Sequence, residues 1–213
     1  MNTHTAPAIF IISVIVLLCV IFIDQPLSLA LRALEADTPA ITNFFRTITH
    51  IAKSWWMLTG LAIMAAGFYA AWKVTGKRDY QSLAVRLLFM FACIAAAGLM
   101  TDGLKIIFGR ARPVLLDQEN IFSFGLFEFA SRWHSFPSGH ATNIFALAFS
   151  ALMLLRRYAL VVLAAACFLA SARVVIHAHF LADIMAGALV AGLMCYVIHR
   201  ICVVRQWLTS PPA

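Results

Sequence analysis

Six apolar segments, each close to the length of a membrane-spanning helix, constrain the fold of this chain more than any other feature. A helix needs roughly 20 apolar residues to cross the hydrocarbon core of a bilayer. The segments are Ala8–Ile23, Trp55–Trp72, Ser82–Met100, Gly139–Leu155, Tyr158–Val175 and Ile184–Cys202. They predict an all-α integral membrane protein built as a bundle of six transmembrane helices.

The composition agrees with this prediction and excludes an ordinary soluble domain. Of the 213 residues, 63% are hydrophobic and only 12% are charged, which is far too apolar for a soluble protein. The length suits a single domain over residues 1–213, with its core at about 55–202. The five cysteines lie in apolar stretches without paired spacing, so we interpret them as packing residues and not as disulfides or metal ligands.

The formal net charge is +7, but no basic run indicates nucleic-acid binding. Alternating spans place eight lysines and arginines on each side of the membrane, whereas eight of the nine acidic residues fall on the side opposite the N-terminus. Cytoplasmic loops usually carry the excess of lysine and arginine. If three or four cations on that opposite side bind substrate, fewer remain there to orient the chain, and the N-terminal side becomes the cytoplasmic one. We therefore expect a multi-pass bacterial inner-membrane protein with cytoplasmic termini.

The N-terminus has no basic region of the kind that begins a secretory signal, because the first lysine or arginine is Arg32. We interpret Ala8–Ile23 as a retained first span, with a cleaved signal as the alternative.

Residues 38–53 have the pattern of an amphipathic helix that lies on the membrane surface. Thr38-Pro39 is a typical helix start. Apolar residues follow at spacings of three and four from Ile41 to Ile51. The opposite face holds Thr42, Asn43, Arg46, Thr49 and Lys53. Such a helix serves either as a lid packed on the spans or as a guide for lipid.

The stretch Arg173–Asp183 places an arginine, two histidines and an aspartate between two apolar segments. Ionisable groups at membrane depth are costly, so they indicate a functional site. His179 and Asp183 are four residues apart and share one face of a local helix. The carboxylate could bond one ring nitrogen of His179 and leave the other free to attack.

Two more groups of polar residues fall on the same side of the membrane as this stretch. Lys105 and Arg112 are seven residues apart, two turns of a helix that Pro113 then interrupts. Ser138 and Gly139 stand at the start of the fourth span, where backbone N–H groups and the helix dipole favour an anion.

Together with Arg173, these groups predict a phosphate-sized anion site. His179 would act as nucleophile, oriented by Asp183, and His140 as general acid to the leaving oxygen. The cations would stabilise the phosphoryl group during transfer. A metal triad of His177, His179 and Asp183 is less favoured, because a fourth ligand is lacking and the nearby cations repel a metal ion.

The three groups resemble the signatures of the type 2 phosphatidic acid phosphatase (PAP2) superfamily of membrane lipid phosphatases. Lys-x6-Arg-Pro is complete at Lys105, Arg112 and Pro113, and Pro-Ser-Gly-His is complete from Pro137 to His140.

The third signature, Ser-Arg-x5-His-x3-Asp, matches at Arg173, His179 and Asp183. It departs from the pattern in that Ala172 separates Arg173 from the preceding serine. His177 stands where the family often has glycine, and Leu181 where it often has proline. The turn can therefore be shaped differently, and His177 could assist or substitute in some role.

The resemblance implies that His179 forms a phosphohistidine intermediate, that Asp183 orients it, and that His140 protonates the leaving group and then activates water. It also implies the set of phosphate-binding residues, which is Lys105, Arg112, Ser138, Gly139 and Arg173. Neither a metal nor another cofactor is needed, and vanadate should inhibit.

The implied activity is hydrolysis of a phosphomonoester or diphosphate on a membrane lipid at the periplasmic face. Candidate substrates are undecaprenyl diphosphate, phosphatidylglycerophosphate and the 1-phosphate of lipid A, and phosphotransfer to another lipid is a close variant. Residues 109–113 and 135–142 resemble stretches of lipid A 1-phosphatase-like proteins. The non-enzymatic alternative, a lipid-phosphate or anion carrier, would need the cations but no histidine–aspartate pair.

Overall fold

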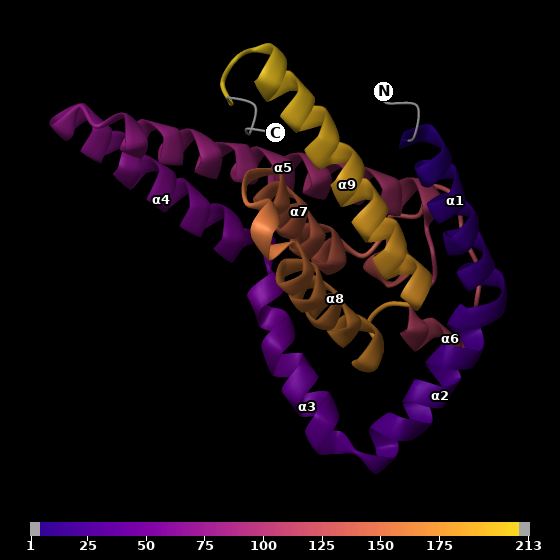
Figure 1. Ribbon diagram of the computed structural model, residues 1–213. Coiled ribbons are helices and arrows are strands. Elements are labelled where there is room, and N and C mark those ends of the chain that lie inside the picture. Colours follow the sequence, from indigo (N-terminus) through magenta and orange to yellow (C-terminus); the bar gives the residue numbers. More distant parts are fainter. Residues whose placement is uncertain (1–4, 209–213) are drawn as a thin grey trace.

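Regular structure in the described part of this chain is helical, as the sequence predicts. The computed structural model describes residues 5–208, apart from the side chains of residues 5, 34–37 and 51. The longer helices are α1 (Thr5–Leu18), α2 (Asp24–Asp37), α3 (Pro39–Ile48), α4 (Ser54–Thr75), α5 (Arg78–Phe108), α6 (Pro113–Glu119), α7 (Gly139–Leu154), α8 (Ala159–Val175) and α9 (Leu181–Val204). Their order and arrangement are shown in Figure 1.

Among the described residues, five helical stretches are long and apolar enough to cross a membrane. They are Ala6–Ala33, Ser54–Thr75, Arg78–Phe108, Arg156–Val175 and Leu181–Val204. The sixth predicted span corresponds to α7, which is apolar but has only 16 residues. At 1.5 Å per residue it is about 24 Å long, less than the roughly 30 Å of a bilayer core.

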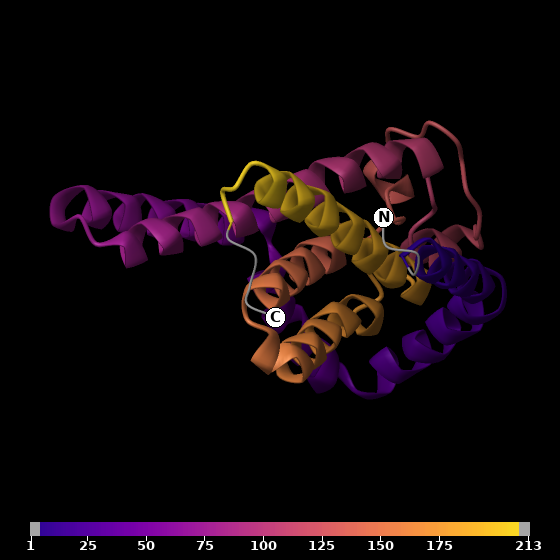
Figure 2. The ribbon, with the colours of Figure 1, turned by 45° about the horizontal axis from the view of Figure 1, so that its top comes forward.

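The first apolar segment does not end as a separate helix at Ile23, because α1 continues through a π-helical stretch, Cys19–Ile23, into α2. Helix α4 and the N-terminal part of α5 extend away from the remaining helices (Figures 1 and 2), whereas the rest of α5 packs against α7 and α9. Helices α2 and α3 meet in a V on the opposite side of the molecule (Figure 1). The N-terminal part of the chain, from α1 to α3, thus lies outside the helices that carry the site.

Helix α7 lies at the centre of the bundle and packs against α5, α8 and α9. Its buried side chains are mostly small: Ala141, Thr142, Asn143, Ala146, Ala148 and Ser150 lie inside with Ile144 and Phe145. Small residues let neighbouring helices approach closely in a membrane protein. The approach to α9 is tightest at Gly187, where an added Cβ would lie 2.8 Å from the Ser138 carbonyl oxygen. This contact brings the N-terminal ends of α7 and α9 together.

The segment predicted as an amphipathic helix contains α3 and a 3₁₀ turn, Thr49–Ala52. Its polar face is not turned wholly away from the protein. Thr42 and Thr49 are buried, whereas Ile41 and Phe44 are exposed. Part of the polar face therefore contacts the bundle, where α3 packs on α8.

The prediction that Lys105 and Arg112 lie two turns apart on one helix was wrong, because α5 ends between them. The helix ends at Phe108 because Gly109 adopts a left-handed conformation (φ +50°). The later part of the loop folds back: the N–H groups of Gly125 and Glu128 donate to the carbonyl oxygens of Gly109 (2.8 Å) and Ile106 (3.1 Å). Arg112 therefore lies in the loop just before α6, and Lys105 lies in the last turn of α5.

Replacing Gly109 with alanine should destabilise the protein. The new Cβ would have to occupy a left-handed backbone and would lie only 1.7 Å from the Gly125 carbonyl oxygen. We expect a loss of about 2 kcal/mol or more, which lowers the apparent Tm in detergent by at least about 4 °C. Gly103→Ala is the matched control, since nothing lies within 4 Å of its added Cβ. Equal melting temperatures for the two variants would contradict this account of the loop.

Candidate active site

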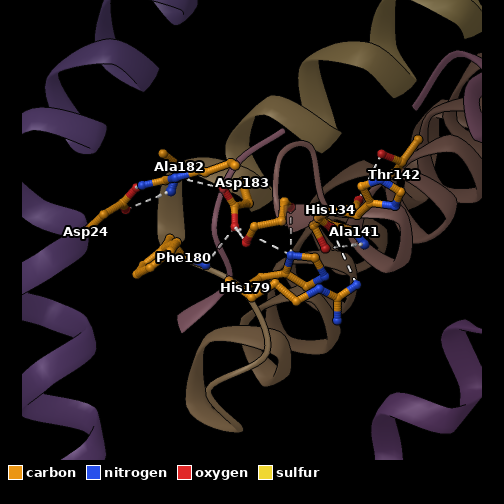
Figure 3. Close-up of polar contacts among 12 residues, drawn as sticks. Asp24, His134, Ala141, Thr142, His179, Phe180, Ala182 and Asp183 are labelled. Carbon is orange, nitrogen blue, oxygen red and sulfur yellow. Dashed lines mark hydrogen bonds and ion pairs between the residues drawn. The ribbon is translucent and has the colours of Figure 1, made fainter. Parts of the chain in front are cut away.

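Four helix ends bring the predicted site residues together. The last turns of α5 and α8 supply Lys105 and Arg173, and the first turns of α7 and α9 supply His140 and Asp183. His179 lies in the short connection between α8 and α9. Figure 3 shows His179 and Asp183 side by side, with Asp24 approaching Asp183 and Ala182 from the N-terminal helix.

His179 is buried, and its orientation is fixed by a backbone carbonyl. Its Nδ1 lies 2.8 Å from the carbonyl oxygen of Ser135. A carbonyl oxygen can only accept a hydrogen bond, so Nδ1 carries the proton and Nε2 keeps its lone pair. The nearest Asp183 oxygen is 3.5 Å from the same Nδ1. The sequence predicted Asp183 as the direct hydrogen-bond partner, whereas the shorter bond goes to Ser135.

The Asp183 carboxylate is fully buried and is held by three donors. Oδ1 accepts from Arg110 at 2.6 Å. Oδ2 accepts from the Ser135 hydroxyl at 2.6 Å and from the Phe180 N–H at 2.9 Å. Ser135 therefore contacts Asp183 through its side chain and His179 through its carbonyl. The carboxylate fixes the surroundings of His179 more than it bonds the ring itself.

Arg110 and Asp24 complete this network, and the sequence did not single out either of them as a site residue. Arg110 is 1% exposed and lies between two carboxylates, with Nη2 2.8 Å from Asp24 Oδ2. Its guanidinium carbon is 4.3 Å from the centre of the Phe180 ring. Asp24 also accepts a hydrogen bond from the Ala182 N–H at 3.0 Å. The signal available in the sequence was an aspartate directly after the first apolar segment, since an ionisable group at membrane depth indicates a functional partner.

Arg112 and Arg173, the two predicted arginines of the phosphate site, each have an N–H group that no other described residue uses. Arg112 donates to the His134 carbonyl oxygen at 3.4 Å, and Arg173 to the Thr49 hydroxyl at 3.4 Å. The Nε atom of each is buried without a hydrogen-bond partner among the described residues. Guanidinium groups held in this way can bind phosphate oxygens at two points.

Lys105 approaches the start of α7 because residue 139 is a glycine. A Cβ on Gly139 would lie 3.0 Å from Lys105 Nζ, so any larger residue would displace the ammonium group. Lys105 Nζ is also 2.8 Å from Asp102 on the same helix, where the Asp102 side chain is largely exposed. The cation thus lies beside the first turn of α7, where orphan backbone N–H groups favour an anion.

The backbone N–H of Ser138 was expected to bind the anion, but in the structure it is already used. That N–H donates to the Asp183 carbonyl oxygen at 3.0 Å. The Ser138 hydroxyl accepts from the Ala141 N–H at 3.5 Å as the N-cap of α7. What Ser138 retains for a ligand is the donor of its hydroxyl group, and its backbone ties α7 to α9.

His140 is half-buried in the first turn of α7. It lies within electrostatic range of Arg173, His179 and Lys105. Lys53, which the sequence placed on the polar face of residues 38–53, also lies within this range. The structure therefore adds Lys53 to the cations around the predicted acid.

His177 points away from the other two members of the alternative metal triad. Its ring nitrogens lie 2.9 Å from Asp117 Oδ2 and 2.6 Å from the Ser28 carbonyl oxygen. The ring is thus engaged by α6 and α2 and not by Asp183. His177, His179 and Asp183 do not converge on one point, and His177 does not substitute for either neighbour.

Comparison with known proteins assigns the family. Residues 86–207 match the model of the PAP2 superfamily, more than half of the chain. The chain belongs to the PAP2 superfamily. It is therefore a membrane lipid phosphatase and a phosphoric ester hydrolase, and not the non-enzymatic carrier that its sequence left open.

Two curated PAP2 relatives and two solved structures are similar to the chain. The lipid A 1-phosphatase of Rhizobium johnstonii is 30% identical over 81% of this chain and 70% of its own length. The lipid A 1-phosphatase of Rhizobium etli is 29% identical over 78% of this chain and 76% of its own length. The crystal structure of Aquifex aeolicus LpxE superposes with a TM-score of 0.54 at 18% identity, covering 76% of this chain and 87% of that one.

The other structure is a PAP2-type phosphatidylglycerolphosphate phosphatase from Bacillus subtilis, with a TM-score of 0.59 at 19% identity. It covers 92% of this chain and 96% of its own. At these identities the two structures show the shared fold.

Removing Arg110 and removing Arg112 should have different consequences. Arg110→Met leaves two buried carboxylates without their cation, which we expect to cost about 3–5 kcal/mol and to lower the apparent Tm by at least about 6 °C. Arg112→Met removes a guanidinium with a spare donor, so stability should change little while phosphate release falls. Thermal unfolding and phosphate release in detergent measure both effects. A normal melting temperature for Arg110→Met would contradict its place in the buried network.

Burial lowers the pKa of His179, and the positive charges of Arg173 and Arg112 lower it further against the opposing effect of Asp183. Burial disfavours the imidazolium, so the neutral ring should persist to a pH below the ordinary histidine value of about 6.5. Exchange of the ring C2 hydrogen with deuterium, followed across pH by mass spectrometry, measures this pKa directly. A midpoint at or above the ordinary value would show that the ring is not shielded as described.

Proposed function

We propose that this protein removes phosphate from a membrane lipid through a covalent intermediate on His179, without a metal ion. The observation that carries the proposal is the fixed tautomer of the buried His179 ring. Its Nδ1 proton is committed to the Ser135 carbonyl, which leaves Nε2 as a nucleophile. Arg112 and Arg173 lie within electrostatic range of the ring, where they can stabilise a phosphoryl group as it transfers.

In the first step, Nε2 of His179 attacks phosphorus while the bond between phosphorus and the lipid oxygen breaks. His140 donates a proton to the departing oxygen. In the second step, His140 removes a proton from water, the water oxygen attacks the phosphohistidine, and inorganic phosphate leaves. Lys105, Arg112 and Arg173 hold the phosphate oxygens, assisted by the Ser138 hydroxyl and the backbone at Gly139. Asp183 positions the nucleophile through Ser135.

We further propose a six-helix arrangement in the inner membrane, with α7 as the sixth span and the site on the periplasmic side. The short α7 can serve as a span because α5, α8 and α9 pack against it. The distribution of charge supports this orientation. Of the eight cations on the side of the site, three belong to the phosphate pocket and Arg110 is buried in ion pairs. The eight cations on the other side then outnumber those left to orient the chain.

The 1-phosphate of lipid A is the substrate we favour, because both curated relatives are lipid A 1-phosphatases and align over more than two thirds of the chain. Phosphatidylglycerophosphate is the second candidate, supported by the solved phosphatase whose fold covers 92% of this chain. Undecaprenyl diphosphate, and transfer of the phosphoryl group to another lipid, are the remaining alternatives.

The test is release of inorganic phosphate by the detergent-purified protein in the presence of EDTA, from lipid A, phosphatidylglycerophosphate, phosphatidic acid and undecaprenyl diphosphate. We expect release from lipid A, inhibition by vanadate, and a loss of at least about 10³-fold in His179→Gln. His199→Gln makes the same chemical change near the other end of α9 and should keep wild-type activity.

Phosphate release by His179→Gln at the wild-type rate would exclude the covalent mechanism. Loss of activity with EDTA would exclude the metal-free reaction. Release from another lipid of the panel in preference to lipid A would replace the favoured substrate.

A further inference from the structure

Three polar residues of α2 form a stripe along one face of that helix. Asp24, Ser28 and Arg32 are spaced four residues apart, so each lies one turn beyond the last. We call them the α2 polar stripe. They precede residues 86–207, the part that matches the family. Ser28 contacts the connection between α8 and α9, Arg32 contacts Asp117, and Asp24 contacts the first turn of α9.

The stripe engages both ends of the connection that carries His179. At one end, the Ser28 carbonyl oxygen lies 2.6 Å from His177 Nε2, and the Ser28 hydroxyl lies 3.1 Å from the same atom. At the other end, Asp24 accepts the Ala182 N–H at 3.0 Å. His179 lies between these two fixed points.

The third member of the stripe acts through α6. Arg32 Nη1 lies 3.2 Å from Asp117 Oδ1, and Asp117 Oδ2 lies 2.9 Å from His177 Nδ1. The His177 side chain is only 9% exposed, and that of Asp117 is 16% exposed. The imidazole is thus held on both sides, by Ser28 from α2 and by Asp117 from α6.

His177 also has an uncommon backbone conformation. It adopts φ +58°, just after the end of α8, where the Ala178 N–H donates to the Arg173 carbonyl oxygen at 3.0 Å. Helices that end in this way usually have glycine at the left-handed position, because a Cβ is unfavourable there. The contacts of the ring with Asp117 and Ser28 offset this cost and hold the turn in one shape.

We propose that the α2 polar stripe, with Asp117 and His177, positions the nucleophile of the reaction. These are positioning residues: they hold residues 176–183 so that His179 faces the phosphate, and they do not contact the phosphate themselves. The proposal rests on the proposed function of His179. A displacement of a reacting group by about 1 Å can cost roughly 10²-fold in rate, so a loosened turn should lower kcat more than it changes KM.

The first test uses His177→Gly, Asp117→Ala and the double variant, purified in detergent and assayed for phosphate release. Glycine accepts φ +58° without strain, so His177→Gly removes the ring and keeps the turn allowed. We expect each single variant to lower kcat by about tenfold or more with KM within about twofold. Because both remove the same contact, the double variant should be no slower than the slower single variant.

Glu119→Ala is the matched control for Asp117→Ala. It removes a carboxylate from the same short helix, where Glu119 is partly exposed and lies 3.6 Å from Arg132. This variant should keep the wild-type kcat. Wild-type kcat in His177→Gly, or independent losses that multiply in the double variant, would overturn the proposal.

The second measurement does not depend on turnover. Amide hydrogen exchange of a peptide covering residues 176–183 should be faster in Asp117→Ala and His177→Gly than in the wild type, and unchanged in Glu119→Ala. Unchanged exchange in all three variants would overturn the proposal. If His179→Gln were as active as the wild type, the proposed function would fail, whereas the exchange result would still report whether the contact between Asp117 and His177 holds the turn.

Discussion

The ion pairs of Arg110 are the interaction on which the rest of the site depends. This guanidinium is buried between Asp24 and Asp183, which come from the first long helix and the last. A buried charge without its partner costs several kcal/mol, so the loop after α5 and these two helices are stable together and not apart. Through Asp183 and Ser135, the same network reaches the ring of His179. The contacts that hold the helices together therefore also fix the orientation of His179, the proposed nucleophile.

The site has two parts with different origins in the chain. The cations and histidines that contact phosphate in the proposed mechanism all lie within the segment that matches the PAP2 superfamily. The residues that hold them from outside, Asp24, Ser28 and Thr49, precede that segment. Some of the positioning contacts therefore come from outside the matched segment, although Arg110, Asp117 and His177 lie within it.

Local sequence was sufficient for the elements and for much of the site. Hydrophobic length located the long helices, because a bilayer selects apolar segments by length. The ends were less accurate for two of them: the first helical stretch continues ten residues beyond Ile23, and α5 continues eight residues beyond Met100. Alternation of the spans then placed Lys105, His140, Arg173 and His179 on one side, since consecutive helix ends must alternate. Backbone geometry was harder to predict. The two-turn spacing of Lys105 and Arg112 was wrong because Gly109 ends the helix between them, and the orientation of α3 depends on its contact with α8.

By itself, the sequence determined the helical membrane architecture and the set of ionisable residues at one side of it, because both follow from patterns shorter than a helix. Tertiary structure decided which groups pair. The partner of the His179 Nδ1 is a backbone carbonyl, which every residue has and which no motif can distinguish. Arg110 pairs with carboxylates that are distant in the chain, and Ser28 meets His177 across 149 positions. Such pairings depend on how the helices pack, so only the folded chain reveals them.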